Sequence, residues 1–250
     1  MNKDKLYELK KYNLQATETL KKDSLSEKVI GYEKFHFCFQ NPLIKFEELI
    51  KKHISPGMNV IELASGQGNY TGFIAAQKAE VFSTDISLNS LKVASKYLNN
   101  FDNVIYQVAD MENLPFKSNI FDALVIAGSL SYGNLNIIQS EINRVLKKNG
   151  LLIVVDSLNE NPIYKFKRLF DVLRKKRTKS SYLNLPKMKT IDNFSKDFEI
   201  LDLSFYGSIT WLLNFFPNRR WVKSFSLSFD NAIKCKKSAF MFTFVGKKNF

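Results

Sequence analysis

The residues best suited to chemistry lie in one stretch, Val60–Tyr70, where an apolar run contains Glu62 and ends in two glycines, Gly66 and Gly68. Glycines at this spacing permit a tight turn and a close approach of the backbone to a ligand. The N–H groups at the start of the following helix favour a polar or anionic group. This order predicts a nucleotide-binding turn, although such glycine pairs also occur in loops that bind nothing.

Two further carboxylates follow later apolar runs: Asp85 comes after 80–84, and Asp110 comes after 103–108. In a parallel sheet the carboxyl ends of the strands share one edge, and ligands bind there. We therefore expect Asp85 to accept the hydroxyls of a ribose and Asp110 to accept the exocyclic amine of an adenine, with Met111 packing on the ring. Both acids also suit local roles, Asp85 as a helix N-cap and Asp110 as the cap of a turn.

The elements that position these residues alternate in type. A helix is predicted to begin at Pro42 and to end at 55–57. Apolar runs predict buried strands at 58–64, 80–84, 103–108, 121–127 and 150–155. Runs with helical periodicity between them predict helices near 70–79, 87–99 and 134–148. This alternation indicates an α/β fold with a doubly wound sheet. Two later strand-like runs, 198–206 and 240–245, bring the sheet to about seven mostly parallel strands.

The chain is expected to form one domain preceded by a helical arm. Residues 1–40 include a polar, lysine-rich segment with a loose helical pattern and are predicted to form an N-terminal cap, and 41–250 the main domain. Basic, aromatic insertions near 157–196 and 207–237 are expected to cover the active-site edge of the sheet as substrate lids. The 45% hydrophobic content of the 250 residues is sufficient for a substantial core.

The net charge of +13 is concentrated in one segment, because ten basic residues face one acid between Asn161 and Thr190. Such a surplus favours phosphates, anionic lipid or acidic substrates, and a compositional bias of the genome is the alternative explanation. Cys38 and Cys235 are too few for a disulfide framework and lack partners at metal-ligand spacing, so we expect a reducing cytosol and no metal site. Without a long apolar run, we expect neither a secreted nor an integral membrane protein.

In combination these motifs resemble the class I S-adenosylmethionine-dependent methyltransferases over roughly residues 40–156. The resemblance rests on Glu62–Gly68, the two later acids, Leu114–Phe116 with Phe121-Asp122, and Arg144–Gly150. It implies a Rossmann-like fold with S-adenosylmethionine as the cofactor. The chain departs from the family at Ala64 and Asn149, where glycine is frequent.

The resemblance also implies roles for individual residues. Glu62 would orient the methionine end of the cofactor, and the two glycines would line it. Asp85 would hold the ribose. The predicted cofactor-binding set is Glu62, Ala64, Gly66, Gly68, Asp85, Ile86, Asp110, Met111 and Ala127. A nicotinamide dehydrogenase fits less well, because Thr71 stands where its third glycine would be and three carboxylates would repel a pyrophosphate but attract a sulfonium.

The candidate catalytic residues are His36 and Tyr132. Methyl transfer is an in-line displacement, to which alignment alone contributes about 7–11 kcal/mol, and a hydroxyl acceptor also needs a base. His36 lies in a segment that in this resemblance often closes over the cofactor, and Tyr132 follows the fourth strand. Both residues also suit a packing role. His53 is expected to interact with the end of its own helix.

The composition of the two late insertions indicates what kind of methyl acceptor to expect. Apolar residues between Phe166 and Leu173 repeat at helical spacing among basic residues. The segment Trp211–Trp221 also combines aromatic and basic residues. One interpretation is a lid with its apolar face in the core. The other is an entrance that recognises a small-molecule or lipid-linked acceptor, optionally phosphorylated, at a membrane surface. The sequence of the segment Arg177–Ser180 resembles sequences in methyltransferases associated with bacterial surface-polysaccharide synthesis.

We therefore expect methyl transfer to a small-molecule, sugar or lipid-linked acceptor, at oxygen. The protein is expected to be cytoplasmic, with peripheral contact to the inner face of the membrane as an option. Two alternatives stay open: an RNA-directed methyltransferase, and a non-catalytic module that docks on RNA or anionic membrane. Nucleic acid is the less favoured partner, because no RNA-binding module and no Asn-Pro-Pro-Tyr-like sequence is recognisable. The oligomeric state is not indicated.

Overall fold

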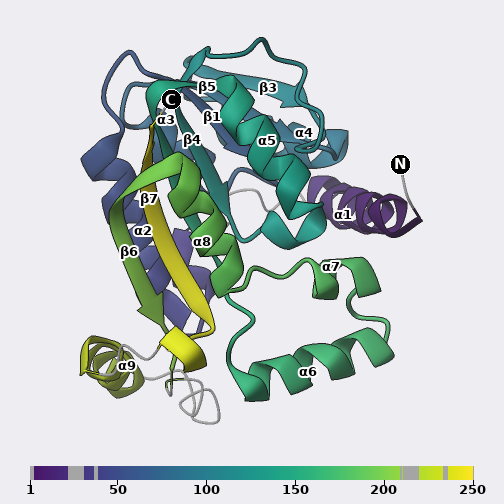
Figure 1. Cartoon of the computed structure of the whole chain (residues 1–250). Helices are drawn as coiled ribbons and strands as arrows, with labels where there is room; N and C mark the ends of the chain where they lie inside the picture. Colours follow the sequence, from purple (N-terminus) through teal and green to yellow (C-terminus); the bar gives the residue numbers. More distant parts are fainter. Residues whose placement is uncertain are drawn as a thin grey trace.

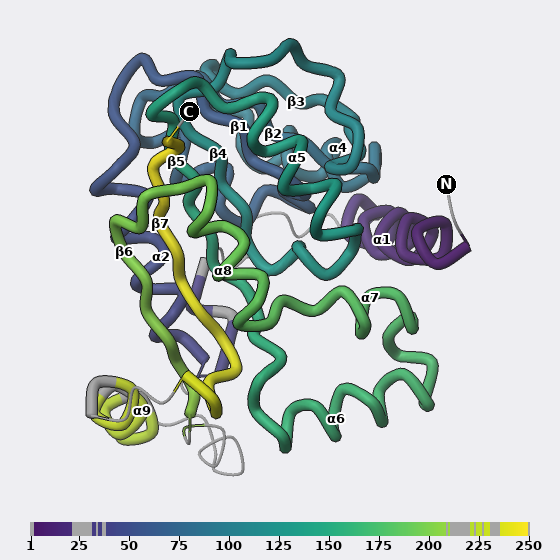
Figure 2. Tube along the Cα trace, viewed as in Figure 1, coloured from purple at the N-terminus to yellow at the C-terminus, as the bar shows by residue number. Residues whose placement is uncertain are grey.

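The computed structural model describes residues 3–21, 31–36, 39–208, 210, 220–232 and 236–249. Within them a seven-stranded sheet has the order β3-β2-β1-β4-β5-β7-β6, as Figures 1 and 2 show. The strands are β1 (Asn59–Leu63), β2 (Glu80–Asp85), β3 (Val104–Val108), β4 (Phe121–Ala127), β5 (Leu146–Ser157), β6 (Phe198–Tyr206) and β7 (Met241–Lys248). Every neighbouring pair is parallel except the two that involve β7. The predicted doubly wound, mostly parallel sheet is confirmed.

Helices cover both faces of this sheet. They are α1 (Lys3–Lys21), α2 (Gln40–His53), α3 (Thr71–Ala75), α4 (Leu88–Tyr97), α5 (Leu135–Val145), α6 (Pro162–Leu173), α7 (Lys179–Leu183), α8 (Met188–Asp197) and α9 (Arg220–Ala232), with the short 3₁₀ helices η2 (Gly31–Lys34), η4 (Leu130–Tyr132) and η6 (Lys236–Ser238). Helices α5 and α8 pack on the face toward the viewer in Figure 1, and α2 packs on the opposite face.

The central strand β4 is apolar from Ala123 to Ala127, and its burial on both faces explains this pattern. Leu124 and Ile126 point into the core beneath α5 and α8, whereas Ala123 and Val125 point into the core beneath α2 and α3. Successive side chains of a strand alternate between faces, so a strand covered on both sides needs no polar positions. The polar residues are therefore displaced to the strand ends.

Two predicted boundaries were wrong by several residues. The helix expected to reach residue 148 ends at Val145, and β5 begins at Leu146, which pairs with Phe121 before a register shift. Asn149, in the left-handed region at φ 62°, turns the chain within β5, just before residue 150, where the strand was predicted to begin. Similarly, the helix predicted to extend to residue 79 ends at Ala75, and Lys78 turns the chain with φ 61°.

The arm and the first insertion meet at the carboxyl end of the parallel strands. Helix α1 contacts α4 on one side, where Ser87 Oγ donates to Asn13 Oδ1 at 2.6 Å. On its other side it contacts the segment around α7, where Ser180 N donates to Asp4 Oδ2 at 3.0 Å. The division of the chain at residue 40 stays a prediction.

Several predicted features fall outside the described residues. These are Cys38, Cys235 and residues 211–219 of the predicted aromatic segment. Among the described residues, no helix is both long and apolar enough to cross a membrane. The same residues contain no group of three or more His, Cys, Asp or Glu side chains that could hold a metal ion.

Candidate active site

A cavity of about 630 Å³ lies at the carboxyl ends of β1, β2 and β4, beneath α1. Two groups of side chains that line it are named by their chemistry. The carboxylates of Glu62, Asp85 and Asp110 are called the carboxylate wall. The side chains of Tyr12, Phe35, Phe39, Tyr132 and Phe240 are called the aromatic wall. Eight of the nine residues predicted to bind a cofactor line this cavity, namely Glu62, Ala64, Gly66, Asp85, Ile86, Asp110, Met111 and Ala127.

The ninth residue, Gly68, is not among the cavity-lining residues. Its φ of 82° lies in the left-handed region, and a Cβ added there would come within 2.9 Å of the Ala94 Cβ on α4. Gly68 therefore lets the turn pack closely against a helix. Gly66, at φ 57°, has open space around its added Cβ and faces the cavity. The sequence pattern gave both glycines one role, whereas the structure separates a packing glycine from a lining glycine.

Glu62 is the most buried carboxylate of the wall, at 2% exposure. Thr71 Oγ1 donates a hydrogen bond to its Oε2 at 2.5 Å. Burial raises the pKa of Glu62 to about 7, and the nearby Asp85 charge adds to this effect while the Thr71 hydrogen bond opposes it. Among the described residues, no basic side chain forms an ion pair with this carboxylate. A cationic ligand would therefore stabilise its ionised form.

Asp85 connects the glycine turn to the end of β2. Its Oδ2 accepts from Gly66 N at 2.9 Å and its Oδ1 accepts from Ser87 N at 2.7 Å. Burial raises the pKa of this carboxyl, and the two backbone hydrogen bonds oppose the shift. The N-cap of α4 is Ser87, which accepts from Ser90 N at 3.1 Å, so the N-cap alternative for Asp85 was wrong.

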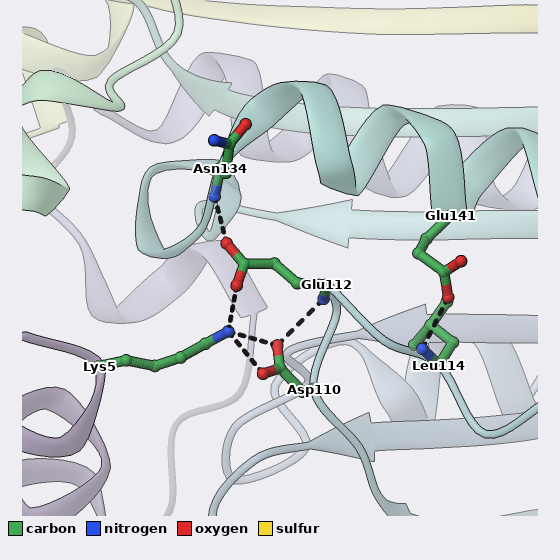
Figure 3. A network of polar contacts seen from close by, with 6 residues as sticks. All are labelled: Lys5, Asp110, Glu112, Leu114, Asn134 and Glu141. Carbon is green, nitrogen blue, oxygen red and sulfur yellow. Dashed lines mark hydrogen bonds and ion pairs between the residues drawn. The ribbon is translucent and has the colours of Figure 1, made fainter. Parts of the chain in front are cut away.

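Asp110 is held by a residue that the sequence did not single out (Figure 3). Lys5 Nζ of α1 donates to Asp110 Oδ1 at 2.6 Å and also to Glu112 Oε2 at 2.5 Å. Asp110 additionally accepts from Glu112 N at 3.0 Å, which is the local turn role that the sequence left open. Burial opposes the charge of Lys5, but the hydrogen bonds and charges of the two acids outweigh it and raise its pKa. The start of α1 is thus attached to the end of β3.

Tyr132 lies on the aromatic wall and shares a hydrogen bond with Tyr12 of α1, with 2.5 Å between the hydroxyl oxygens. The two rings meet edge to face at 5.7 Å. Burial raises the pKa of Tyr12, so this residue stays neutral at physiological pH. Below the pair, Asp156 Oδ2 accepts from Leu130 N at 2.9 Å and so positions the 3₁₀ turn that carries Tyr132.

His36, the other predicted catalytic residue, is not among the cavity-lining residues. Its ring packs against Phe39, with 6.4 Å between centroids, and Phe39 does line the cavity. A catalytic role for His36 stays a prediction. Sequence reasoning missed Lys5, Tyr12 and Thr71. Thr71 could have been recognised, because a hydroxyl nine residues after an isolated buried glutamate at a strand–turn–helix junction is placed to hydrogen-bond it.

Comparison with known proteins agrees with this site. A family model described as a methyltransferase domain matches residues 61–154. The ubiquinone/menaquinone biosynthesis C-methyltransferase UbiE of Wigglesworthia glossinidia brevipalpis is 29% identical over 191 residues, which cover 68% of this chain and 71% of the relative. UbiE of Shewanella oneidensis is 35% identical over 144 residues, and this match covers 53% of each protein, so the chain spans about half the length of that relative.

Solved structures show the same fold at low sequence identity. Geranyl diphosphate C-methyltransferase from Streptomyces coelicolor A3(2), in complex with Mg²⁺, geranyl diphosphate and S-adenosyl-L-homocysteine, has a TM-score of 0.60 and 15% identity over 82% of this chain and 79% of that chain. The [4+2]-cyclase SpnF has a TM-score of 0.63 and 17% identity over 96% and 94%. At such identities the likeness shows the fold alone. The sheet topology, the carboxylates of the cavity and the methyltransferase domain matched over residues 61–154 agree, and together they support a class I S-adenosylmethionine-dependent methyltransferase.

Proposed function

We propose that this protein methylates a small acceptor with a mainly apolar body and a phenol-type hydroxyl, at the ring carbon or at the oxygen. The observation that carries the proposal is that the carboxylate wall and the aromatic wall line one and the same cavity of about 630 Å³. Such a volume is in the range of cavities that enclose drug-sized ligands.

The carboxylate wall suits the methyl donor, which is cationic at its sulfonium and its ammonium. Glu62 would take the ammonium, because a cation stabilises the charge of a carboxylate that burial otherwise disfavours. Asp85 would accept the ribose hydroxyls, since each of its oxygens retains a lone pair beyond the backbone hydrogen bond it already accepts. Asp110 would receive the adenine amine on the lone pair of Oδ2 that the Lys5 hydrogen bond leaves free. These roles follow the family pattern residue by residue.

The aromatic wall suits an apolar, planar acceptor. Phe35, Phe39 and Phe240 offer ring surfaces, and the paired hydroxyls of Tyr12 and Tyr132 offer one polar contact among them. That contact would orient an acceptor hydroxyl, while the surrounding rings would exclude water and align the acceptor with the donor.

The side chains near this contact are weak bases, and this limits how acidic the hydroxyl of the methyl acceptor must be. Tyr12 is neutral, and the nearby carboxylate that lines the cavity from the same helix is Glu8, which accepts from Thr178 Oγ1 at 3.2 Å. A phenol ionises near pH 10, as tyrosine does, whereas an alkyl alcohol is far less acidic. Weak proton acceptors therefore favour a phenol-type acceptor over a sugar hydroxyl. The names of the two quinone-biosynthesis relatives support the same direction, including carbon as the methylated atom.

Labelled methyl transfer tests the proposal. The folded protein is incubated with S-adenosylmethionine carrying a ¹³C-methyl group and with three acceptor classes: alkylated phenols or quinols, sugar nucleotides with glycolipids, and RNA. We expect label only in the first class, and carbon and oxygen products are distinguished by NMR. Label confined to sugars or glycolipids would overturn the proposal and support an acceptor of surface-polysaccharide synthesis. Label confined to RNA would support the nucleic-acid alternative. Donor binding without turnover on any natural extract would support the non-catalytic module.

A further inference from the structure

The outer side of α6 carries an exposed apolar stripe, in contrast to the interpretation that its apolar face lies in the core. Phe166 and Leu173 are 75% and 72% exposed, and Ile163, Leu169 and Phe170 are also exposed. At about 100° per residue, these five side chains fall within an arc of about 120° on the helix. A continuous apolar arc of this kind on a monomer surface indicates an interaction site.

The orientation of α6 is fixed by its opposite side. Tyr164 stacks on Phe240 with 4.7 Å between ring centroids and 13° between the ring planes. Arg168, one turn later, is 8% exposed and donates from Nη1 to the Leu158 carbonyl at 3.0 Å. The Asn161 side chain caps the first turn by accepting from Ile163 N at 3.0 Å. The stripe therefore points away from the domain, as the outlying position of α6 in Figure 1 indicates.

Basic residues border the stripe. On the helical wheel Lys165 and Lys167 stand on either side of the apolar arc. Exposed basic residues continue past the end of the helix, at Arg174, Lys175, Lys176 and Lys179. Asp171 is the one acid between Pro162 and Lys179. An apolar face with cationic flanks is the pattern of helices that lie in the interface of an anionic membrane.

Helix α9 adds an aromatic pair at the same end of the molecule. Trp221 and Phe225 are 41% and 52% exposed and meet edge to face at 5.9 Å. Strands β5 and β6 are both antiparallel to β7, so they run in the same direction, and α6 and α9 each follow the carboxyl end of one of them. Both helices lie at the lower end of the molecule in Figure 1. Exposed tryptophan is typical of the membrane–water interface.

We propose that α6, assisted by the aromatic pair of α9, docks this protein on an anionic lipid surface. The apolar stripe would enter the boundary between headgroups and acyl chains, and the flanking lysines would contact lipid phosphates. A second copy of the chain is a poorer occupant, because it would place two strongly basic segments against each other in a protein that already carries a charge of +13. RNA would leave the apolar stripe uncovered.

Docking would also place the acceptor end of the cavity near the lipid. Tyr164 of the docked helix stacks directly on Phe240, which lines the aromatic wall. An apolar acceptor could therefore pass from the bilayer to the cavity along this helix. This consequence rests on the proposed function, whereas the docking itself does not.

Co-sedimentation of the full chain with vesicles tests the docking. We expect binding to vesicles of phosphatidylglycerol and phosphatidylethanolamine, little binding to phosphatidylcholine, and weakening at raised salt. The paired substitution Phe166→Ser with Leu173→Ser should lower the vesicle affinity by about tenfold or more, because two apolar side chains no longer leave water. Leu14→Ser is the matched control, since Leu14 is 62% exposed on α1, and it should bind like the unchanged protein.

Two further measurements keep the outcome unambiguous. Calorimetry with S-adenosylmethionine should give the same affinity for the paired variant as for the unchanged protein, which shows that the fold and the donor site are intact. Sedimentation velocity should show a monomer without lipid. The proposal is overturned if the unchanged protein stays in the supernatant with anionic vesicles, if the Leu14 control loses as much affinity as the paired variant, or if the stripe proves to be the contact of a dimer that the paired variant dissolves.

Discussion

Replacing Glu62 by Gln should make the cofactor-free protein more stable and the cofactor complex weaker. Glu62 is buried, and its pKa in the folded protein is about 7, against an ordinary value of 4.5. Because the folded-state pKa is raised, the stability that this group contributes is fully present below pH 4.5 and is lost as the pH rises through 7. A glutamine has no proton to lose, and its Oε1 can still accept the Thr71 hydrogen bond.

The pKa difference sets the size of the effect. About 2.5 pH units at 1.36 kcal/mol each correspond to about 3 kcal/mol of stability that the unchanged protein loses between pH 4.5 and a pH well above 7. For a chain of this length, about 3 kcal/mol corresponds to a difference in melting temperature of about 6–12 °C. Asp156, whose burial raises its pKa to about 6, contributes its own pH dependence, but equally to both proteins. The difference between the two proteins therefore isolates Glu62.

The assay is thermal unfolding of both cofactor-free proteins at pH 5 and pH 8, followed by calorimetry with S-adenosylmethionine. We expect a small advantage in melting temperature for Glu62→Gln at pH 5 and a clear advantage at pH 8. The variant should bind the donor about 10–100-fold more weakly, because a charge-assisted hydrogen bond is lost. A variant that melts below the unchanged protein at pH 8, or that binds the donor equally well, would refute the reasoning.

Three further substitutions probe other parts of the site. Lys5→Met removes the ion pairs to Asp110 and Glu112 and should increase the rate at which a protease cleaves within α1; an unchanged cleavage rate would show that these contacts do not hold the helix. Tyr132→Phe leaves the Tyr12 hydroxyl without this partner and should lower kcat about tenfold or more with unchanged affinity for the donor. An equal loss in kcat and in donor affinity would indicate a merely structural role. Ala64→Gly should raise stability by up to about 1 kcal/mol in chemical denaturation, because Ala64 occupies the left-handed region at φ 51°, and a loss of stability would contradict that strain.

The sequence predicted the carboxylate wall because local patterns determine it. Apolar runs locate the strands, and parallel strands bring their carboxyl ends to one edge, so Glu62, Asp85 and Asp110 had to gather there. The packing of Gly68 against Ala94 on the next helix was not predicted, because a motif records spacing along the chain and not contacts between elements.

The rest of the site could not be predicted, because it depends on where α1 docks. Lys5 meets Asp110 across 105 residues, and Tyr12 meets Tyr132 across 120. The periodicity of α1 predicts a helix, but it contains no information about which polar residue will face which strand end. The direction of the α6 stripe was equally open, since an apolar face at helical spacing fits a core and a surface alike.

The position of α1 has a kinetic consequence. This one helix contributes Lys5, beside Asp110, and Tyr12, beside Tyr132, to the same cavity, and it is attached to the α7 segment through Asp4. Under the proposed function, donor and acceptor would both lie beneath this helix, so a single opening of the helix would release both products. We expect their release to be coupled, and the Lys5→Met variant, which weakens one attachment of this cover, is the means to alter that step without changing the chemistry of the acceptor end.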